Sequence, residues 1–98
     1  MIAILWRYRA APGAEAGFRA AYGPDGDWAR LFRQAPGYVR TELLEGGDGV
    51  FATLDYWASE AAFEAFQSAF GEAYGALDAE CEALTREEER LGLFSVVG

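Results

Sequence analysis

One acidic residue, Asp55, lies in an otherwise apolar stretch and is the best candidate for acid–base chemistry. Residues 50–57 (VFATLDYW) alternate between two largely apolar sides, which predicts a strand buried on both faces. An enzyme needs at least one ionisable group of perturbed pKa inside a cavity, and a carboxylate among aromatic side chains is such a group. Asp55 is therefore the first candidate for a catalytic residue.

The preceding strand, predicted for residues 38–45, supplies a candidate partner for Asp55. In the register that we expect for the hairpin between the two strands, Arg40 lies directly opposite Asp55, and Tyr38 lies on the same face. A register shifted by two residues would set Glu42 against Asp55, and two facing carboxylates repel each other. Asp55, Arg40 and Tyr38 are thus the predicted catalytic residues, and the alternative is a structural ion pair in a subunit interface.

Six large aromatic residues are candidates for the lining of a substrate cavity. For each of them the alternative is a place in a filled hydrophobic core. We expect a ligand site on the side of the strand that carries Asp55, beneath Phe66 and Phe70 of the helix that follows. The six candidates are Trp28, Trp57, Phe63, Phe66, Phe70 and Tyr74.

Missing residue types exclude several kinds of site. The chain has no histidine, and Cys81 is its only cysteine. A Ser–His–Asp triad, a His-ligated haem or metal ion, and a multi-cysteine metal site are therefore impossible within the chain, and we expect no cofactor.

The net charge of -8 argues against nucleic acid and anionic membranes as partners, because both require clustered basic residues. No apolar run approaches the ~20 residues of a membrane span, and a single thiol without a signal peptide suggests the cytoplasm.

The hydrophobic periodicity predicts one domain over residues 1–98. One hairpin lies between two helical crossovers. With right-handed crossovers this order gives a four-stranded antiparallel sheet with helices on one face, which is the ferredoxin-like α+β arrangement. Near the C-terminus, Glu82 and Arg86 form a favourable i, i+4 pair that indicates a helix. The expected strands cover about residues 2–9, 38–45, 50–57 and 93–97, and the expected helices about 14–22, 28–34, 59–70 and 77–90.

The second face of such a sheet requires a cover. Hydrophobic residues make up 52% of the chain and aromatic residues 15%, which is more apolar surface than a small monomer easily hides. The predicted strand 50–57 is apolar on both sides. We therefore expect a homodimer joined through the open sheet faces.

Three local motifs resemble a known family. Pro12-Gly13-x-Glu15-x-x-Phe18, Pro36-Gly37-Tyr38 and Trp57-x-Ser59-x-x-Ala62-Phe63 span most of the chain, and at these spacings they are similar to the antibiotic biosynthesis monooxygenase superfamily. The resemblance implies a dimeric α+β barrel of two ferredoxin-like sheets, with a ligand cavity between the sheet and the helices of each subunit. It also implies an oxidoreductase, because members include cofactor-independent monooxygenases of polycyclic aromatic substrates.

The resemblance leaves two functions open. The haem-degrading branch relies on a first-strand Asn, a Trp in the central helix and a following His, so the absence of His excludes it here. The remaining enzymatic function is oxidation of an aromatic or quinone-like metabolite that is deprotonated to an electron-rich anion and then reacts with dioxygen. The alternative is a non-catalytic barrel that binds a small apolar ligand or serves as an oligomerisation unit.

Overall fold

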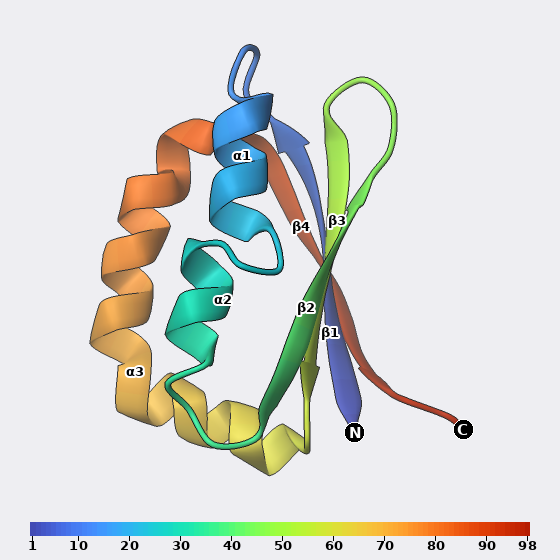
Figure 1. Cartoon of the computed structure of the whole chain (residues 1–98), viewed down its shortest axis with the longest axis vertical. Coiled ribbons are helices and arrows are strands. Elements are labelled where there is room, and N and C mark those ends of the chain that lie inside the picture. Colours follow the sequence, from blue (N-terminus) through green and yellow to red (C-terminus); the bar gives the residue numbers. More distant parts are fainter.

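The computed structural model describes residues 1–98 and contains one four-stranded antiparallel sheet. The strands are β1 (Ile2–Ala10), β2 (Tyr38–Glu45), β3 (Val50–Trp57) and β4 (Thr85–Ser95), in the spatial order β2-β3-β1-β4. The β2–β3 hairpin lies between two helical crossovers (Figure 1). This topology confirms the ferredoxin-like α+β arrangement predicted from the sequence.

All the helices lie on one face of the sheet (Figure 1). They are α1 (Glu15–Tyr22), α2 (Asp27–Phe32), α3 (Glu60–Cys81) and a short 3-10 helix, η1 (Glu82–Leu84). Ser59 caps α3, because its side-chain oxygen accepts a hydrogen bond from the Ala62 amide at 3.1 Å. At Phe70 the backbone leaves helical geometry, with φ -117° and ψ 19°, and α3 bends there around the sheet. None of these helices combines the length and the apolar character needed to cross a bilayer.

The hydrophobic core fills the space between the helices and the sheet. Its largest fully buried side chains are Trp57, Phe18, Phe51 and Phe66, each less than 2% exposed. Aromatic rings make edge-to-face and stacked contacts throughout this layer, which adds stabilisation beyond the buried area alone. The opposite face of the sheet has no covering element in the chain.

The C-terminal region differs from the sequence prediction. We predicted a helix over residues 77–90, but α3 ends at Cys81 and residues 85–95 form the edge strand β4. This strand pairs with β1 along nearly its whole length, and Arg9 and Glu87 form an ion pair across it at 3.7 Å. The Glu82–Arg86 pair would stabilise a helix by only about 0.2–0.5 kcal/mol. The backbone hydrogen bonds that β4 forms with β1 outweigh this preference. The last strand is therefore longer than predicted.

The hairpin register also differs from the prediction, with consequences for the candidate site. Tyr38 lies opposite Trp57 as expected, but Arg40 pairs with Tyr56 and Thr41 with Asp55. The register shifts between Tyr38 and Arg40, where an extra residue bulges out of β2. A shift of one residue moves every side chain beyond it to the other face of the sheet.

Gly37 holds the start of β2 against α3 in front of this bulge. Its φ is +89°, and a Cβ atom there would come within 2.6 Å of the Ala62 Cβ atom. The Gly37 carbonyl also accepts a hydrogen bond from the Ala58 amide at 2.7 Å. Only glycine permits both the backbone angle and this close approach. The packing therefore fixes where β2 begins.

Candidate functional site

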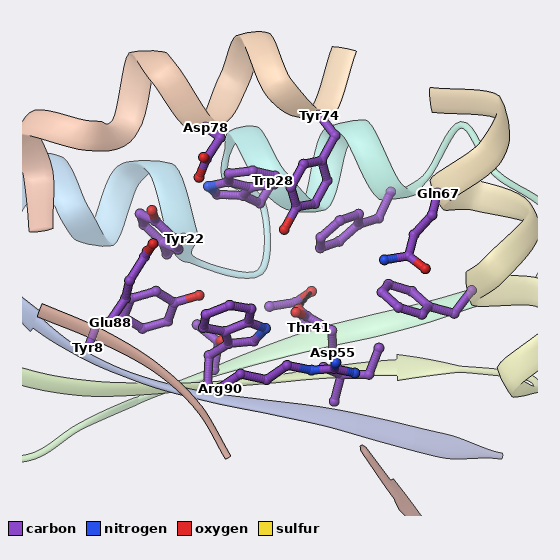
Figure 2. Close-up of a pocket in the computed structure, with 15 residues that line it drawn as sticks. Tyr8, Tyr22, Trp28, Thr41, Asp55, Gln67, Tyr74, Asp78, Glu88 and Arg90 are labelled. Atoms are coloured by element: carbon purple, nitrogen blue, oxygen red, sulfur yellow. Dashed lines mark hydrogen bonds between the residues drawn. The ribbon is translucent and has the colours of Figure 1, made fainter. Parts of the chain in front are cut away.

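A cavity of about 110 Å³ lies between the sheet and the helices (Figure 2). This is well above the roughly 10–15 Å³ that a cavity needs to hold a single water molecule, so it has room for several waters or part of a small ligand. The four lining residues that are exposed form its rim, namely Gln67, Asp78, Glu88 and Arg90. The sheet contributes Ile4, Trp6, Tyr8, Thr41, Thr53 and Asp55 to the lining, and the helices contribute Tyr22, Trp28, Phe32, Phe63 and Tyr74.

Asp55 lies on the sheet side of this cavity and carries a perturbed carboxyl group. Burial raises its pKa from 3.8 to about 6, and a hydrogen bond from Thr41 partly opposes that rise. Thr41 Oγ1 donates to Asp55 Oδ1 at 2.8 Å. The Thr41 proton is then engaged, so Tyr38 donates its hydroxyl proton to Thr41 Oγ1, also at 2.8 Å. A chain of three side chains thus leads from the cavity to the half-buried Tyr38.

The predicted ion pair between Arg40 and Asp55 does not form. Arg40 lies on the open face of the sheet, where its guanidinium carbon is 4.0 Å from the centre of the Tyr56 ring. Its nearest carboxylate is Glu42, also at 4.0 Å. The bulge in β2 turns Thr41, and not Arg40, toward Asp55. Asp55 consequently has no ion-pair partner to compensate its charge.

The six predicted aromatic residues occupy three different places. Trp28, Phe63 and Tyr74 line the cavity. Trp57 and Phe66 are 0% and 1% exposed and belong to the packed core. Phe70 stacks on Phe66 and lines a separate apolar groove between α3 and residues 35–37.

The cover of the cavity therefore differs from our expectation. The residues of α3 above Asp55 are Phe63, Gln67 and Tyr74, whereas we expected Phe66 and Phe70. The bend at Phe70 changes which side of the helix meets the sheet, and helical periodicity alone does not predict that bend.

Sequence reasoning missed two tyrosines of the cavity. Tyr8 and Tyr22 are each 6% exposed, and burial raises the pKa of both hydroxyls, as it does that of Tyr74. All three tyrosines therefore remain neutral hydrogen-bond donors at physiological pH. The alternation of residues 2–10 could have indicated Tyr8, because it shares a strand face with Ile4 and Trp6.

The cavity also contains polar groups without partners. Thr53 Oγ1 and Trp28 Nε1 are buried and form no hydrogen bond. Trp57 Nε1 is likewise unpaired, within the core. Such atoms are uncommon in folded proteins, because each costs about 1–3 kcal/mol when it is removed from water without a partner. Unpaired groups that line a cavity are natural contact points for a ligand.

The rim carries two carboxylates and one guanidinium. Asp78 of α3 lies near Glu88 of β4 (Figure 2), and burial together with the Asp78 charge raises the pKa of Glu88. Arg90 forms no ion pair with either. Sequence reasoning missed Glu88 because it lies within residues 77–90, which we predicted to form a helix.

Comparison with known proteins gives a family and a fold. A family model described as antibiotic biosynthesis monooxygenase matches residues 1–77, which confirms the resemblance found in the three motifs. A mutant of SnoaB, a cofactor-independent oxygenase from Streptomyces nogalater, matches over 99% of this chain and 93% of its own, with a TM-score of 0.76 and 24% identity. A monooxygenase from the gene ActVA-Orf6 of Streptomyces coelicolor, in complex with Nanaomycin D, matches over 99% and 88%, with a TM-score of 0.73 and 16% identity. Curated proteins give no significant match.

Proposed function

This chain belongs to the antibiotic biosynthesis monooxygenase family, and from that membership we propose that it is a cofactor-independent monooxygenase of a small aromatic or quinone-like metabolite. The observation that carries the proposal is Asp55, an uncompensated carboxyl group with a pKa of about 6 in an aromatic cavity. A base whose pKa lies near the operating pH combines a large ionised fraction with a strong tendency to accept a proton. Two proteins of similar fold, SnoaB and the ActVA-Orf6 protein, are described as a cofactor-independent oxygenase and a monooxygenase.

The proposed reaction begins with proton transfer to Asp55. The carboxylate takes a proton from an activated CH2 group of the substrate, and the electron pair of that C–H bond stays on the substrate as a delocalised anion. Dioxygen then oxidises this anion. One oxygen atom remains in the product as a carbonyl group and the other leaves as water, so the substrate supplies all four electrons and no external reductant is required. The aromatic walls exclude bulk water from the anion.

The hydroxyl chain beyond Asp55 offers a route for the proton to leave. Once Asp55 is protonated, rotation of the two hydroxyls reverses the donor direction of the chain, so that Asp55 donates to Thr41 Oγ1 and Thr41 donates to Tyr38, along two contacts of 2.8 Å each. Tyr38 is half-buried and reaches the edge of the helical layer. In this proposal Thr41 and Tyr38 position Asp55 and restore its ionised form, and Arg40 has no part in the reaction.

We propose that the protein acts as a homodimer. The centre of the open sheet face is apolar, with Leu5 and Leu54 side by side on β1 and β3. Phe94 is 51% exposed on the edge strand β4, beside this centre. Charged residues, including Arg40 and Arg7, surround it. An apolar centre with a charged rim is the usual composition of a subunit interface.

The buried, unpaired Cys81 agrees with a cytoplasmic location.

Oxygen uptake with anthrone and with substituted hydroquinones tests the function. Wild-type protein should consume dioxygen with at least one of these compounds. Asp55→Asn should reduce the rate by about 100-fold or more, because a positioned general base contributes about 10²–10⁴. Glu42→Gln is the matched control, since Glu42 is a strand carboxylate on the open face, and it should keep the wild-type rate. Binding without oxygen uptake would instead favour the non-catalytic barrel.

A further inference from the structure

Thr53 is a buried polar residue whose hydroxyl group has no partner inside the protein. It is 3% exposed, it lines the cavity, and its Oγ1 atom forms no hydrogen bond. Valine has nearly the same shape and would fill this strand position without an unpaired hydroxyl. A threonine here therefore costs stability, and a hydrogen bond to a bound molecule is the natural compensation.

Tyr8 brings a second hydroxyl to the same part of the cavity, near enough to the Thr53 hydroxyl that their interaction partly opposes the rise in the pKa of Tyr8. On β1 it pairs with Phe51, while Trp6 pairs with Thr53, so Tyr8 and Thr53 are diagonal neighbours on the helix-covered face. The Tyr8 hydroxyl points along the cavity toward the end that holds Asp55 (Figure 2). Burial raises the pKa of Tyr8, the Thr53 hydroxyl lowers it in part, and the charge of Asp55 raises it further, so the Tyr8 hydroxyl keeps its proton and can donate it to a ligand.

We propose that the hydroxyl groups of Thr53 and Tyr8 donate hydrogen bonds to the substrate oxygen that becomes negatively charged when Asp55 removes a proton. This inference rests on the proposed function. Thr53 and Asp55 are two residues apart on one strand face, about 6.8 Å between Cα atoms. The reacting C–H group can then face Asp55 while an oxygen of the same ring system meets Thr53.

The placement of the donors matches the movement of charge. Before the reaction the negative charge is on Asp55, which accepts a hydrogen bond from Thr41 and from neither Thr53 nor Tyr8. After proton transfer Asp55 is neutral, and the electron pair of the broken C–H bond is delocalised onto the substrate oxygen. Donors that point at the substrate oxygen, and not at the Asp55 carboxylate, stabilise only the substrate anion that forms after proton transfer. Thr53 and Tyr8 therefore favour the anion without weakening the base.

Ionisation of a bound dye measures this effect directly. Alizarin changes colour when its phenol loses a proton, and the titration is carried out in an Asp55→Asn background, which leaves Asp78 and Glu88 at the rim as the only carboxyl groups that line the cavity. Thr53→Val or Tyr8→Phe added to this background should each raise the pKa of bound alizarin by about one unit, because a hydrogen bond to an anion is lost. Affinity for anthraquinone, which has no ionisable group, should stay within about twofold. Thr85→Val is the matched control, because Thr85 lies outside this cavity, and it should leave the dye pKa unchanged.

Stability separates this role from a structural one. Thr53→Val removes an unpaired buried hydroxyl, so its urea midpoint should equal or exceed that of the parent. A lower midpoint with an unchanged dye pKa would show that Thr53 serves only the fold and would overturn the proposal. An unchanged dye pKa while wild-type protein still consumes dioxygen would refute the donor pair and leave the oxygenase intact. Failure of the parent protein to bind either anthraquinone or alizarin, together with no oxygen uptake, would refute the proposed function and the donor pair with it.

Discussion

Replacing Asp55 with asparagine should stabilise the protein at neutral and alkaline pH. The shift of its pKa from 3.8 to about 6 means that folding disfavours the ionised carboxylate. At about 1.36 kcal/mol for each pKa unit, the ionised form costs about 3 kcal/mol in the folded state. Asparagine is isosteric with the neutral carboxyl group and can still accept the hydrogen bond from Thr41. The substitution leaves no cation unpaired, because the predicted ion pair between Arg40 and Asp55 does not form.

The pH window follows from the direction of the shift. Below pH 3.8 Asp55 is neutral in both the folded and the unfolded state, and it costs nothing. Between pH 3.8 and about 6 the unfolded chain releases this proton while the folded protein retains it, so wild-type stability falls relative to the variant. Above about pH 6 the full cost applies. The free-energy difference between Asp55→Asn and wild type should therefore grow by about 2 kcal/mol from pH 4.5 to pH 8.

Urea unfolding at one fixed protein concentration measures this difference across the pH range. Subtracting the wild-type curve removes the contribution of every other titrating group. Asp48→Asn, in the exposed hairpin turn, is the control and should give a difference that changes much less with pH. A variant that is less stable than wild type at pH 8, or a difference that does not grow with pH, would refute a desolvated and uncompensated Asp55.

Two further predictions concern the rate and the assembly. Thr41→Val removes the hydrogen bond that lowers the pKa of Asp55, so the rise of kcat/KM with pH should move about one unit higher; an unmoved profile would mean that another group is the base. Leu54→Asp places a charge at the centre of the open sheet face and should give monomers or unfolded protein by light scattering, whereas Val97→Asp, at a residue that is 94% exposed, should not. A wild-type chain that is already monomeric at micromolar concentration would contradict the proposed dimer.

Local patterns were sufficient to predict the architecture. The alternation in residues 50–57 placed Asp55 on the same strand face as Thr53 and Trp57, and the structure agrees. Side-chain direction in a strand depends only on the neighbouring residues, so a period of two is visible in the sequence. Local patterns also predicted the hairpin and the order of the four strands along the chain.

The residues around Asp55 depended on contacts that local patterns do not contain. The bulge in β2, next to the tight packing of Gly37 on Ala62, exchanged Arg40 for Thr41 as its neighbour. Either register is compatible with the apolar pattern of the strand itself. A shift of one residue then changes the predicted ion pair into a hydroxyl chain.

Tertiary structure also decided the last strand and the shape of the cavity. Residues 85–90 have a helical charge pattern, yet pairing with β1 makes them a strand and brings Glu88 and Arg90 to the rim. The bend at Phe70 selects Phe63 and Tyr74 to cover the cavity. Each outcome depends on the summed energy of contacts between residues distant in sequence, which exceeds the few tenths of a kcal/mol in local preferences. The sequence by itself therefore determined the fold and singled out Asp55, and only the packed structure decided which residues surround it.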